Sequence, residues 1–316
     1  MSGADMVVQV LADEGVDTIF GYSGGAILPT YDAVFRYNDT NKTAAGKAAI
    51  PLIVPANEQG AGFMASGYAR ASGKVGVVMV TSGPGATNTV TPVRDCMADS
   101  IPIVVICGQV PSAAIGTDAF QEAPVSAIMG AVAKHIFLVT DPSKLEDTVR
   151  SAFDLARTGR PGPVVIDIPK DVQNWEGEFK GHGILPLPGY HRRLTAVSNN
   201  HLSDAACERF YKMLAQSERP LIYAGGGVIS GGATKPMRHF ANEYGVPVTT
   251  TLMALGASDT KHPLALHMLG MHGIASANYA VEDCDFLIAI GARFDDRVAG
   301  DPERFAGNAK NVAQFD

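Results

Sequence analysis

The chain has 316 residues, of which 46% are hydrophobic and only 18% are charged, so it can bury large cores and is not a disordered polypeptide. Its formal net charge of −7 argues against nucleic acid or an anionic membrane surface as its main partner. No apolar run is long enough to span a bilayer, and the four cysteines form no CxxC pair, which argues against a zinc site.

Helices and continuous apolar strands alternate over the first 170 residues. The pattern predicts helices at 4–14, 26–36, 58–71, 86–97 and 145–158. It predicts strands at 18–21, 51–55, 75–81, 101–108, 136–140 and 164–168. Strands that are apolar throughout are typical of a parallel sheet covered on both faces. The sequence therefore predicts a doubly wound α/β domain over residues 1–170.

Residues 171–200 differ in composition, with several Gly and Pro and a polar end, and are predicted to be an interdomain linker. A second α/β unit is predicted over residues 201–316. Its helices are expected at 203–215, 233–244 and 276–282, and its strands at 221–224, 246–251, 285–291 and 312–315. Because a doubly wound domain normally continues through more βα units, we expect the second domain to be incomplete.

Three glycine-rich turns follow predicted strands, at 21–25, 82–88 and 225–232. Each turn can present free backbone N–H groups to an anionic ligand. Each is a weak signal alone, because tight strand-to-helix turns use the same residues. The third turn departs from GxGxxG by one residue of spacing, so a dinucleotide site and a plain turn both remain open.

The first of these turns also fits the GxSxG nucleophile-elbow pattern, with Ser23 at its centre. On this hypothesis the chain is an α/β-hydrolase. Two features argue against it: the turn follows the first strand rather than a later one, and no HGGG-type segment precedes it.

Glu58 is predicted to begin a helix directly after a strand. Carboxylates at that position are usually caps or partners of the helix dipole. The small residues that follow, 60–62 and 65–67, would also let a ligand approach closely at the carboxyl edge of the sheet. The histidines at 262, 267 and 272 do not align on one helix face, which argues against a metal site there.

Seven segments spread in order over nearly the whole chain form a pattern more specific than any one of them: GYSGGAILPTYDA (21–33), NEQGAGFMASGYARASG (57–73), VTSGPGATN (80–88), GQVPSAAIGTDAFQE (108–122), GRPGPVVIDIPKDV (159–172), GMHG (270–273) and IGARFDDRVAG (290–300). Together they resemble the large catalytic subunit of acetohydroxyacid synthase (acetolactate synthase), a family of thiamine diphosphate enzymes. GTDAFQE together with ARFDDR favours this family over other thiamine diphosphate decarboxylases.

The resemblance implies a pyrimidine-binding domain followed by a central FAD-binding, Rossmann-like domain. The family's third domain, which binds the diphosphate and Mg²⁺ through GDG and a distant Asn, is expected to be absent. The implied reaction is decarboxylation of pyruvate and condensation with a second 2-oxoacid, giving 2-acetolactate or 2-aceto-2-hydroxybutyrate for branched-chain amino acid biosynthesis. We expect this chain alone to be inactive. The alternatives are a non-catalytic FAD-binding fragment and a split subunit that needs a partner chain.

The resemblance also implies roles for individual residues. Glu58 would hydrogen-bond the aminopyrimidine ring of the cofactor and favour the tautomer that removes the thiazolium proton. Gly24 and Gly25 would lie beside the reaction centre. Phe120, Gln121 and Lys170 would line the substrate site, and Arg297 would meet the carboxylate of the second oxoacid. The residues that would contact a structural FAD are Arg160, Gly225, Gly226, Gly227, Leu252, Met253, Gly270, Met271, His272, Gly291, Ala292, Arg293 and Asp295.

The expected partners are small 2-oxoacids, a second copy of the chain in a dimer or tetramer, and a small regulatory subunit. The resemblance fits a bacterial cytoplasm, a plastid or a mitochondrion equally well. Two residues depart from the family pattern: Ser23 stands where the family usually has Pro, and Asn57 stands where it usually has His. The second departure puts imidazole chemistry beside Glu58 in doubt.

Overall fold

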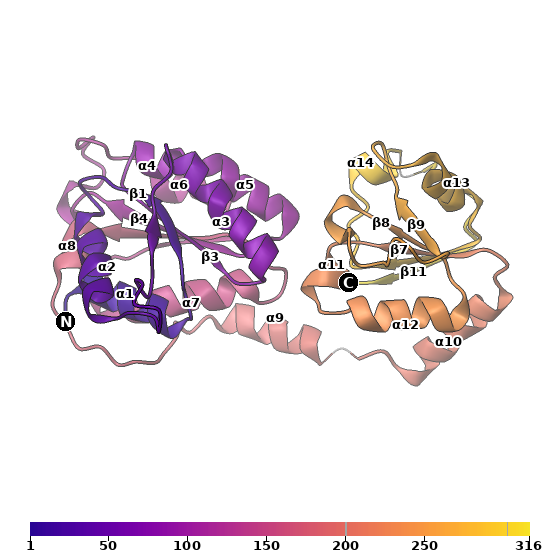
Figure 1. Ribbon diagram of the computed structural model, residues 1–316. Coiled ribbons are helices and arrows are strands. Elements are labelled where there is room, and N and C mark those ends of the chain that lie inside the picture. The colour runs from indigo at the N-terminus through magenta and orange to yellow at the C-terminus, as the bar shows by residue number, and fades with distance from the viewer. Residues whose placement is uncertain (200, 302) are drawn as a thin grey trace. The chain divides into compact units, whose positions relative to one another are not determined.

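The computed structural model describes residues 1–199, 201–301 and 303–316, so Asn200, at the end of the predicted linker, lies outside the described residues. Its contacts divide the chain into two units, Met1–Ser198 and Asn199–Asp316 (Figure 1). Each unit is a parallel sheet with helices on both faces, which confirms the predicted fold class.

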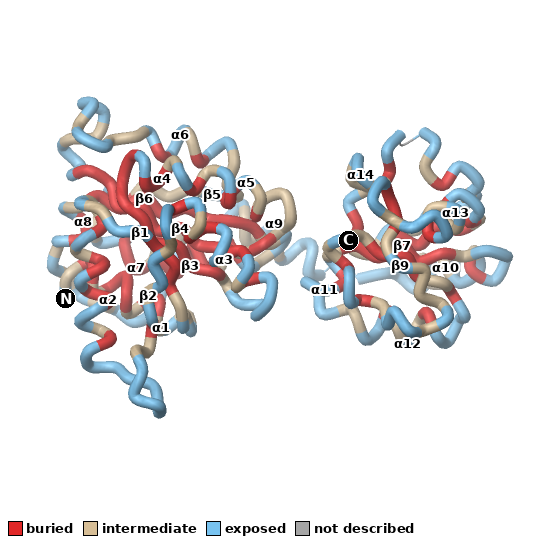
Figure 2. The backbone as a smooth tube through the Cα atoms, turned by 45° about the horizontal axis from the view of Figure 1, so that its top comes forward, coloured by how far each residue is buried: buried red, intermediate tan, exposed pale blue. Residues whose placement is uncertain are grey.

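The first unit contains a six-stranded parallel sheet in the order β2-β1-β3-β4-β6-β5. Its strands are β1 (Ile19–Tyr22), β2 (Leu52–Ile53), β3 (Gly76–Val80), β4 (Ile103–Gln109), β5 (His135–Leu138) and β6 (Val164–Pro169). The central strands β3, β4 and β6 are buried at every residue (Figure 2). This burial on both faces explains why they consist mainly of Val and Ile.

Helices cover the two faces of this sheet and its carboxyl edge. They are α1 (Gly3–Asp13), α2 (Leu28–Thr40), α3 (Glu58–Ser72), α4 (Pro84–Thr87), α5 (Val90–Asp99), α6 (Val125–Gly130), α7 (Leu145–Arg157) and α8 (Lys170–Asn174), with short 3₁₀ turns at Ser112–Ala114 and Pro142–Lys144. One core joins α1, α2 and α7 to alternate strand residues such as Val104, Ile106 and Ile166. The intervening strand residues face the other layer, so each strand contributes to two cores.

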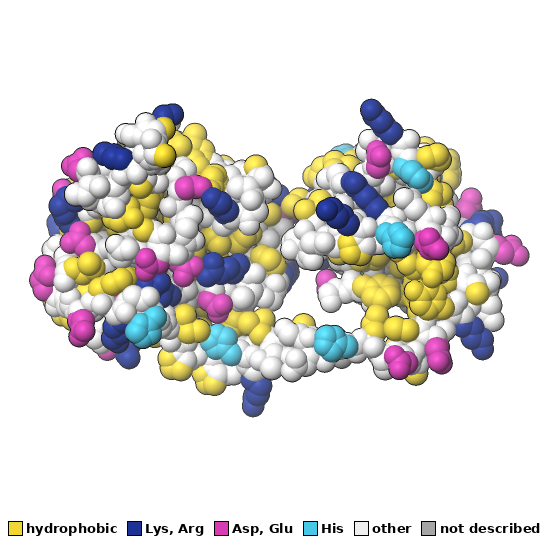
Figure 3. All heavy atoms as spheres, turned by 60° about the horizontal axis from the view of Figure 1, so that its bottom comes forward, with side chains coloured by type: hydrophobic (Ala, Val, Ile, Leu, Met, Phe, Trp, Pro, Cys, Tyr) yellow, Lys and Arg dark blue, Asp and Glu magenta, His cyan; other side chains and the backbone are white. Residues whose placement is uncertain are grey.

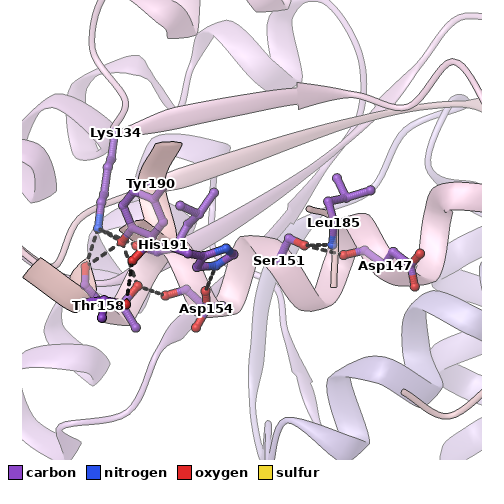
Figure 4. Close-up of polar contacts among 10 residues, drawn as sticks. Lys134, Asp147, Ser151, Asp154, Thr158, Leu185, Tyr190 and His191 are labelled. Carbon is purple, nitrogen blue, oxygen red and sulfur yellow. Dashed lines mark hydrogen bonds and ion pairs between the residues drawn. The ribbon is translucent and has the colours of Figure 1, made fainter. Parts of the chain in front are cut away.

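The segment predicted to be a linker packs against the first unit over its described part. Leu185 N–H donates to Ser151 Oγ on α7 at 2.7 Å, and the Tyr190 hydroxyl donates to the Thr158 carbonyl at 3.0 Å (Figure 4). The segment also forms a helix that the sequence did not predict, α9 (Pro188–Ser198), in which no residue is buried.

The second unit contains a five-stranded parallel sheet in the order β11-β10-β7-β8-β9. Its strands are β7 (Pro220–Ala224), β8 (Val248–Thr250), β9 (Ala265–Met268), β10 (Phe286–Ile290) and β11 (Asn311–Phe315). Its helices are α10 (Asp204–Gln216), α11 (Gly227–Ser230), α12 (Thr234–Tyr244), α13 (Ala275–Asp283) and α14 (Asp296–Ala299), with a 3₁₀ turn at Leu252–Ala254. Phe286 and Ile288 face one core, and Leu287 and Ala289 face the other. β9 lies at the sheet edge and was not predicted.

Asp285 fastens the start of β10 to the end of α10, and it should make the second unit sensitive to acid. Its carboxylate accepts the Ser217 hydroxyl and the amide of Glu218 at 2.9 Å. These bonds lower its pKa to about 2 from 3.8. Because the unfolded chain then binds more protons at pH 2–4, this contribution to stability is present above pH 4 and is lost as the pH falls toward 2.

We expect Asp285→Asn to reduce the loss of stability between pH 4 and pH 2, as measured by unfolding followed by circular dichroism. An equal change in the exposed-site control Asp283→Asn would contradict this role.

The surface of the first unit carries both signs of charge. In the view of Figure 3, acidic and basic side chains are interspersed on it rather than gathered by sign. Among the described residues, no helix combines the length and apolar character needed to cross a membrane.

Candidate functional site

The strand order of the first sheet reverses between β1 and β3, and we call the space outside the carboxyl ends of these two strands the first crevice. From β1 the chain moves outward to β2 and then returns to the other side of β1 as β3. Ligands of open α/β sheets bind where the strand order reverses in this way. The loop after β1 and the loop after β3 therefore form the walls of the candidate site.

These two loops pack so closely that one position requires glycine. A Cβ atom at Gly24 would lie 2.5 Å from Cγ2 of Thr81, the residue that follows β3. Thr81 Oγ1 also accepts the Ala26 amide at 3.3 Å. A Cβ at Gly25 would meet nothing within 4 Å, so the loop leaves open space on that side. Ser23 is exposed and, within the described residues, makes no hydrogen bond to a histidine, so the geometry does not support the hydrolase hypothesis.

Glu58 lies at the first turn of α3, buried beside the same crevice, with 8% of its surface exposed. The Asn88 side-chain amide donates to Glu58 Oε2 at 2.9 Å. A Cβ at Gly85 would lie only 3.7 Å from Glu58 Oε1. Burial and the charge of Glu58 raise the pKa of the nearby Tyr31 hydroxyl above its usual range. The carboxylate therefore has one oxygen held by the protein and the other beside a glycine.

Asn57, the residue that departs from the family pattern, caps the helix that carries Glu58. Its backbone is extended, and its Oδ1 accepts the Gly60 amide at 2.8 Å. Removing such a cap costs about 1 kcal/mol. We expect Asn57→Ala to lower the free energy of unfolding of the first unit by about that amount, and Asn57→Ser to restore most of it. Urea unfolding followed by the fluorescence of Trp175, the only tryptophan, measures this. An unchanged midpoint in Asn57→Ala would rule out the capping role.

A third loop, 110–124, follows β4 and carries two of the predicted substrate residues. Phe120 is 88% exposed, and Gln121 has a positive φ of 58°. The backbone of Gln121 lies against Gly83, where a Cβ atom would collide with the Gln121 carbonyl oxygen. Lys170 begins α8 directly after β6, the strand that pairs with β4. All these residues therefore follow the carboxyl ends of strands in one parallel sheet.

The second sheet has its own reversal point, between β7 and β10. There the glycine-rich turn after β7 packs on the turn after β10. The amide of Gly225 donates to the Ile290 carbonyl at 2.8 Å, and the amide of Gly227 donates to the Gly291 carbonyl at 3.0 Å. A Cβ atom at Gly227 would lie 2.6 Å from the Gly291 Cα. The two turns thus pack backbone against backbone, and we call the space outside the carboxyl ends of β7 and β10 the second crevice.

The other predicted FAD residues of this unit follow the same carboxyl edge. A Cβ at Gly226 would lie 3.0 Å from the Cβ of Met253, which stands with Leu252 in the turn after β8. The Met271 amide donates to the Arg297 carbonyl at 2.8 Å, joining the turn after β9 to α14, the helix that follows the turn after β10. The remaining residues of the predicted set lie in these two turns: Gly270, His272, Ala292, Arg293 and Asp295.

Two of the predicted site residues, Arg160 and Arg297, form hydrogen bonds within their own units. Arg160, in the first unit, donates to Ser100 Oγ at 2.8 Å and to the Met97 carbonyl at 2.9 Å. Arg297, in the second unit, receives a cap from Asp295, whose carboxylate accepts the Arg297 amide at 2.9 Å. The structure thus brings Glu58 and the predicted glycines of each unit to the two reversal points.

Sequence reasoning missed two residues of the first crevice, Thr81 and Asn88. Both lie in the VTSGPGATN segment, which contributes to the family resemblance, but the pattern of that segment assigns a role only to its glycine-rich turn. Among the described residues, no group of three His, Cys, Asp or Glu side chains could hold a metal ion.

In comparisons with known proteins, each of the two units matches a different family domain. Residues 1–128 match the model "Thiamine pyrophosphate enzyme, N-terminal TPP binding domain", and residues 207–316 match "Thiamine pyrophosphate enzyme, central domain". The chain is 47% identical over 312 residues to the acetolactate synthase large subunit of Corynebacterium glutamicum, covering 99% of this chain and 47% of that protein.

Two further relatives extend the similarity across kingdoms. One is the probable acetolactate synthase large subunit of Methanocaldococcus jannaschii, 46% identical over 99% of this chain and 50% of that protein. The other is the chloroplastic acetolactate synthase of Arabidopsis thaliana, 43% identical over 98% of this chain and 44% of that protein. The chain spans about half the length of these relatives. It is a homologue of the acetolactate synthase large subunit and belongs to the thiamine pyrophosphate enzyme family, with the N-terminal and central domains of that family.

Proposed function

We propose that the chain supplies the pyrimidine-binding and FAD-binding parts of an acetolactate synthase. The observation that carries this proposal is the buried Glu58 carboxylate at the reversal point between β1 and β3. Asn88 holds one of its oxygens at 2.9 Å, and glycine-rich turns line the space around it. The extensive identity to acetolactate synthase large subunits supports the assignment of this crevice to a thiamine cofactor.

The residues of the first crevice fit an aminopyrimidine ring. The ring needs a buried acceptor for a protonated nitrogen, and Glu58 Oε1 is an acceptor with a glycine next to it. Thiamine diphosphate supplies, when bound, a carbon nucleophile that attacks the carbonyl of a 2-oxoacid. The task of Glu58 is to hold a proton at the ring nitrogen, with Asn88 fixing the orientation of the carboxylate.

Substrate selection is proposed for the loop residues. Phe120 offers an exposed apolar ring suited to the methyl or ethyl group of a small 2-oxoacid. Gln121 and Lys170 offer a hydrogen-bond donor and a positive charge for its oxygens. Arg297 is proposed to bind the carboxylate of the second oxoacid, since a guanidinium group can form two parallel bonds to it.

The crevice of the second unit fits the phosphate-bearing part of FAD. The turn formed by Gly225, Gly226 and Gly227 exposes backbone where a side chain would block approach. Thr251 Oγ1, in the turn after β8, is buried and has no partner among the described residues, so it can bond a ligand. We expect the 316-residue chain to change the fluorescence of FAD saturably. A folded chain that leaves the flavin signal unchanged would contradict this part of the proposal.

Assembly is also part of the proposal. Phe63 and Met64 are exposed on α3, the helix that begins at Glu58, and apolar side chains at that place suit contact with a second copy. A small regulatory subunit remains a prediction from the resemblance. The Mg²⁺ ion that the resemblance implies also remains a prediction. Light scattering that detects only monomer at micromolar concentration would contradict self-association.

The decisive experiment joins this chain to the part of the Corynebacterium glutamicum large subunit that its match does not cover. The fusion is assayed for acetolactate formed from pyruvate. We expect formation that requires added thiamine diphosphate and is absent from the 316-residue chain alone. A fusion that folds and binds FAD but forms no acetolactate would overturn the proposal, and activity of the 316-residue chain alone would overturn the expectation that it needs further domains.

A further inference from the structure

A buried carboxyl group that none of the proposed functions uses lies inside β6. Asp167 is only 1% exposed. Its Oδ2 accepts a hydrogen bond from Gln109 Nε2 at 3.0 Å, whereas its Oδ1 has no partner among the described residues. Burying a carboxyl group with one oxygen unbonded is costly. The hydrogen bond from Gln109 is therefore the contact from which a role for the buried Asp167 side chain can be inferred.

Gln109, the last residue of β4, connects Asp167 to both ends of the loop 110–124. Its Oε1 accepts the amide of Val110, the first loop residue, at 2.8 Å. Its Nε2 also donates to the carbonyl of Ala123, near the end of the loop, at 3.3 Å. One buried side-chain amide thus joins the start and the end of the loop to one carboxyl group.

The interior of the same loop is braced separately. The Glu122 carboxylate accepts the amides of Gly116 and, at 3.2 Å, Ala119. The Ser112 amide donates to Asp171 Oδ1 at 2.9 Å, which fastens the first turn of the loop to α8. Because the interior is held in this way, the anchoring of the two ends determines where the loop tip lies.

We propose that Asp167 is a positioning residue that acts through Gln109 to hold the loop 110–124, and so fixes Phe120 and Gln121 at the carboxyl edge of the sheet. The importance of these two residues for substrate rests on the proposed function. The anchoring itself does not, since it concerns hydrogen bonds within the first unit.

The strength of this anchor should depend on pH. Burial raises the pKa of Asp167 to about 7, while the hydrogen bond from Gln109 opposes that rise. The bond therefore favours the carboxylate, and by linkage the carboxylate strengthens the bond. Anchoring of the loop should tighten between pH 6.5 and pH 8. The contribution of Asp167 to the stability of the unit changes in the opposite direction, because a raised carboxyl pKa makes folding less favourable as the pH rises toward it.

Groups beside Asp167 and the loop do not reproduce this change. Burial lowers the pKa of Lys134 to about 8, but this residue precedes β5 at the amino edge of the sheet, where its ammonium group donates to the Thr158 carbonyl at 2.7 Å. Burial and the charge of Asp167 raise the pKa of Cys107 on β4 well above its usual range, and burial lowers the pKa of His135 on β5. The backbone amide of Gly116 lowers the pKa of Glu122; burial raises the pKa of Asp171, but the bonds from Ser112 outweigh it and lower that pKa overall. The short helix α6, which packs on β5 and β6, contains no titratable side chain.

Hydrogen–deuterium exchange of the 316-residue chain tests the proposal without any turnover. With intrinsic rates corrected, peptides from 110–124 should exchange about tenfold more slowly at pH 8 than at pH 6.5. The isosteric variant Asp167→Asn should remove this difference. Loop exchange that is equal at the two pH values, or that accelerates at pH 8 along with the rest of the unit, would overturn the proposal. So would a pH difference that persists in Asp167→Asn.

A matched pair of glutamine variants tests the connection directly. Gln109→Leu should accelerate exchange in 110–124 by about 10- to 100-fold. Gln173 is equally buried, but its amide donates to the carbonyls of Ala26 at 2.8 Å and Ile168 at 3.0 Å. Gln173→Leu should therefore loosen the turn after β1 and leave 110–124 protected. Normal protection of the loop in Gln109→Leu would overturn the proposal, whether or not the fusion protein forms acetolactate.

Discussion

Replacing Glu58 with glutamine is expected to reduce acetolactate formation by the fusion protein about 10²- to 10⁴-fold, the usual contribution of a group that positions a catalytic proton. Glutamine keeps the size of the side chain and can still accept the bond from Asn88, which is 2.9 Å long in the structure. It cannot carry the negative charge that favours a proton on the ring nitrogen. The turnover number at saturating pyruvate and cofactor measures the effect.

The control is Glu178→Gln, which changes an exposed glutamate of the same unit. It should leave turnover within about twofold of the parent, because surface substitutions away from special features change stability little. FAD fluorescence should be the same in both variants, since Glu58 belongs to the first unit. Glu58→Gln protein that folds, binds FAD and keeps its full turnover would exclude Glu58 from catalysis.

Replacing Arg150 with methionine is expected to destabilise the first unit by about 3–5 kcal/mol, the usual cost of removing one partner from a buried ion pair. The Arg150 side chain on α7 is 9% exposed, and it bonds Asp13 on α1 at 2.6 Å and Glu146 at 3.1 Å. The Glu146 side chain is only 6% exposed and also accepts the Lys180 amide at 2.8 Å. Without Arg150, a buried carboxylate loses its charge partner. Urea unfolding followed by Trp175 fluorescence measures the loss.

The same helix provides the matched control. Arg157 pairs with Glu14 at 2.6 Å; the Glu14 side chain is 14% exposed, but the Arg157 side chain is 48% exposed, so water reaches its charge. Pairs in which water screens the charges contribute less than about 1 kcal/mol, so Arg157→Met should shift the unfolding midpoint less than Arg150→Met does. Equal shifts in the two variants would show that burial does not determine the strength of these pairs.

The elements of the fold could be predicted where composition and burial agree. β3, β4 and β6 are apolar at nearly every position because both of their faces are covered. β9 was missed because it is a four-residue edge strand with partly exposed side chains, which leaves no continuous apolar run. α9 was missed because it begins with Pro and Gly and buries no residue, so its sequence has no apolar stripe.

The candidate site could be predicted in its parts but not in its assembly. Glu58 stood out because a carboxylate at a helix start was followed by small residues. Its bond to Asn88 joins residues 30 positions apart, and no local pattern reveals it. The packing of Gly24 on Thr81 depends on β1 and β3 being neighbours, which the order of elements along the chain does not show. The GxSxG pattern around Ser23 is the opposite case: the sequence motif is present, but among the described residues no histidine bonds Ser23 to activate it.

The most direct test of the central claim is the exchange of the thiazolium C2 proton of thiamine diphosphate with deuterium on the fusion protein. The rate is measured by NMR on cofactor released after a quench, with no substrate present. We expect exchange on the fusion protein to be much faster than on the free cofactor, and exchange on Glu58→Gln to be about 10²- to 10⁴-fold slower than on the parent fusion. Equal exchange rates in the two proteins, with cofactor bound to both, would contradict it.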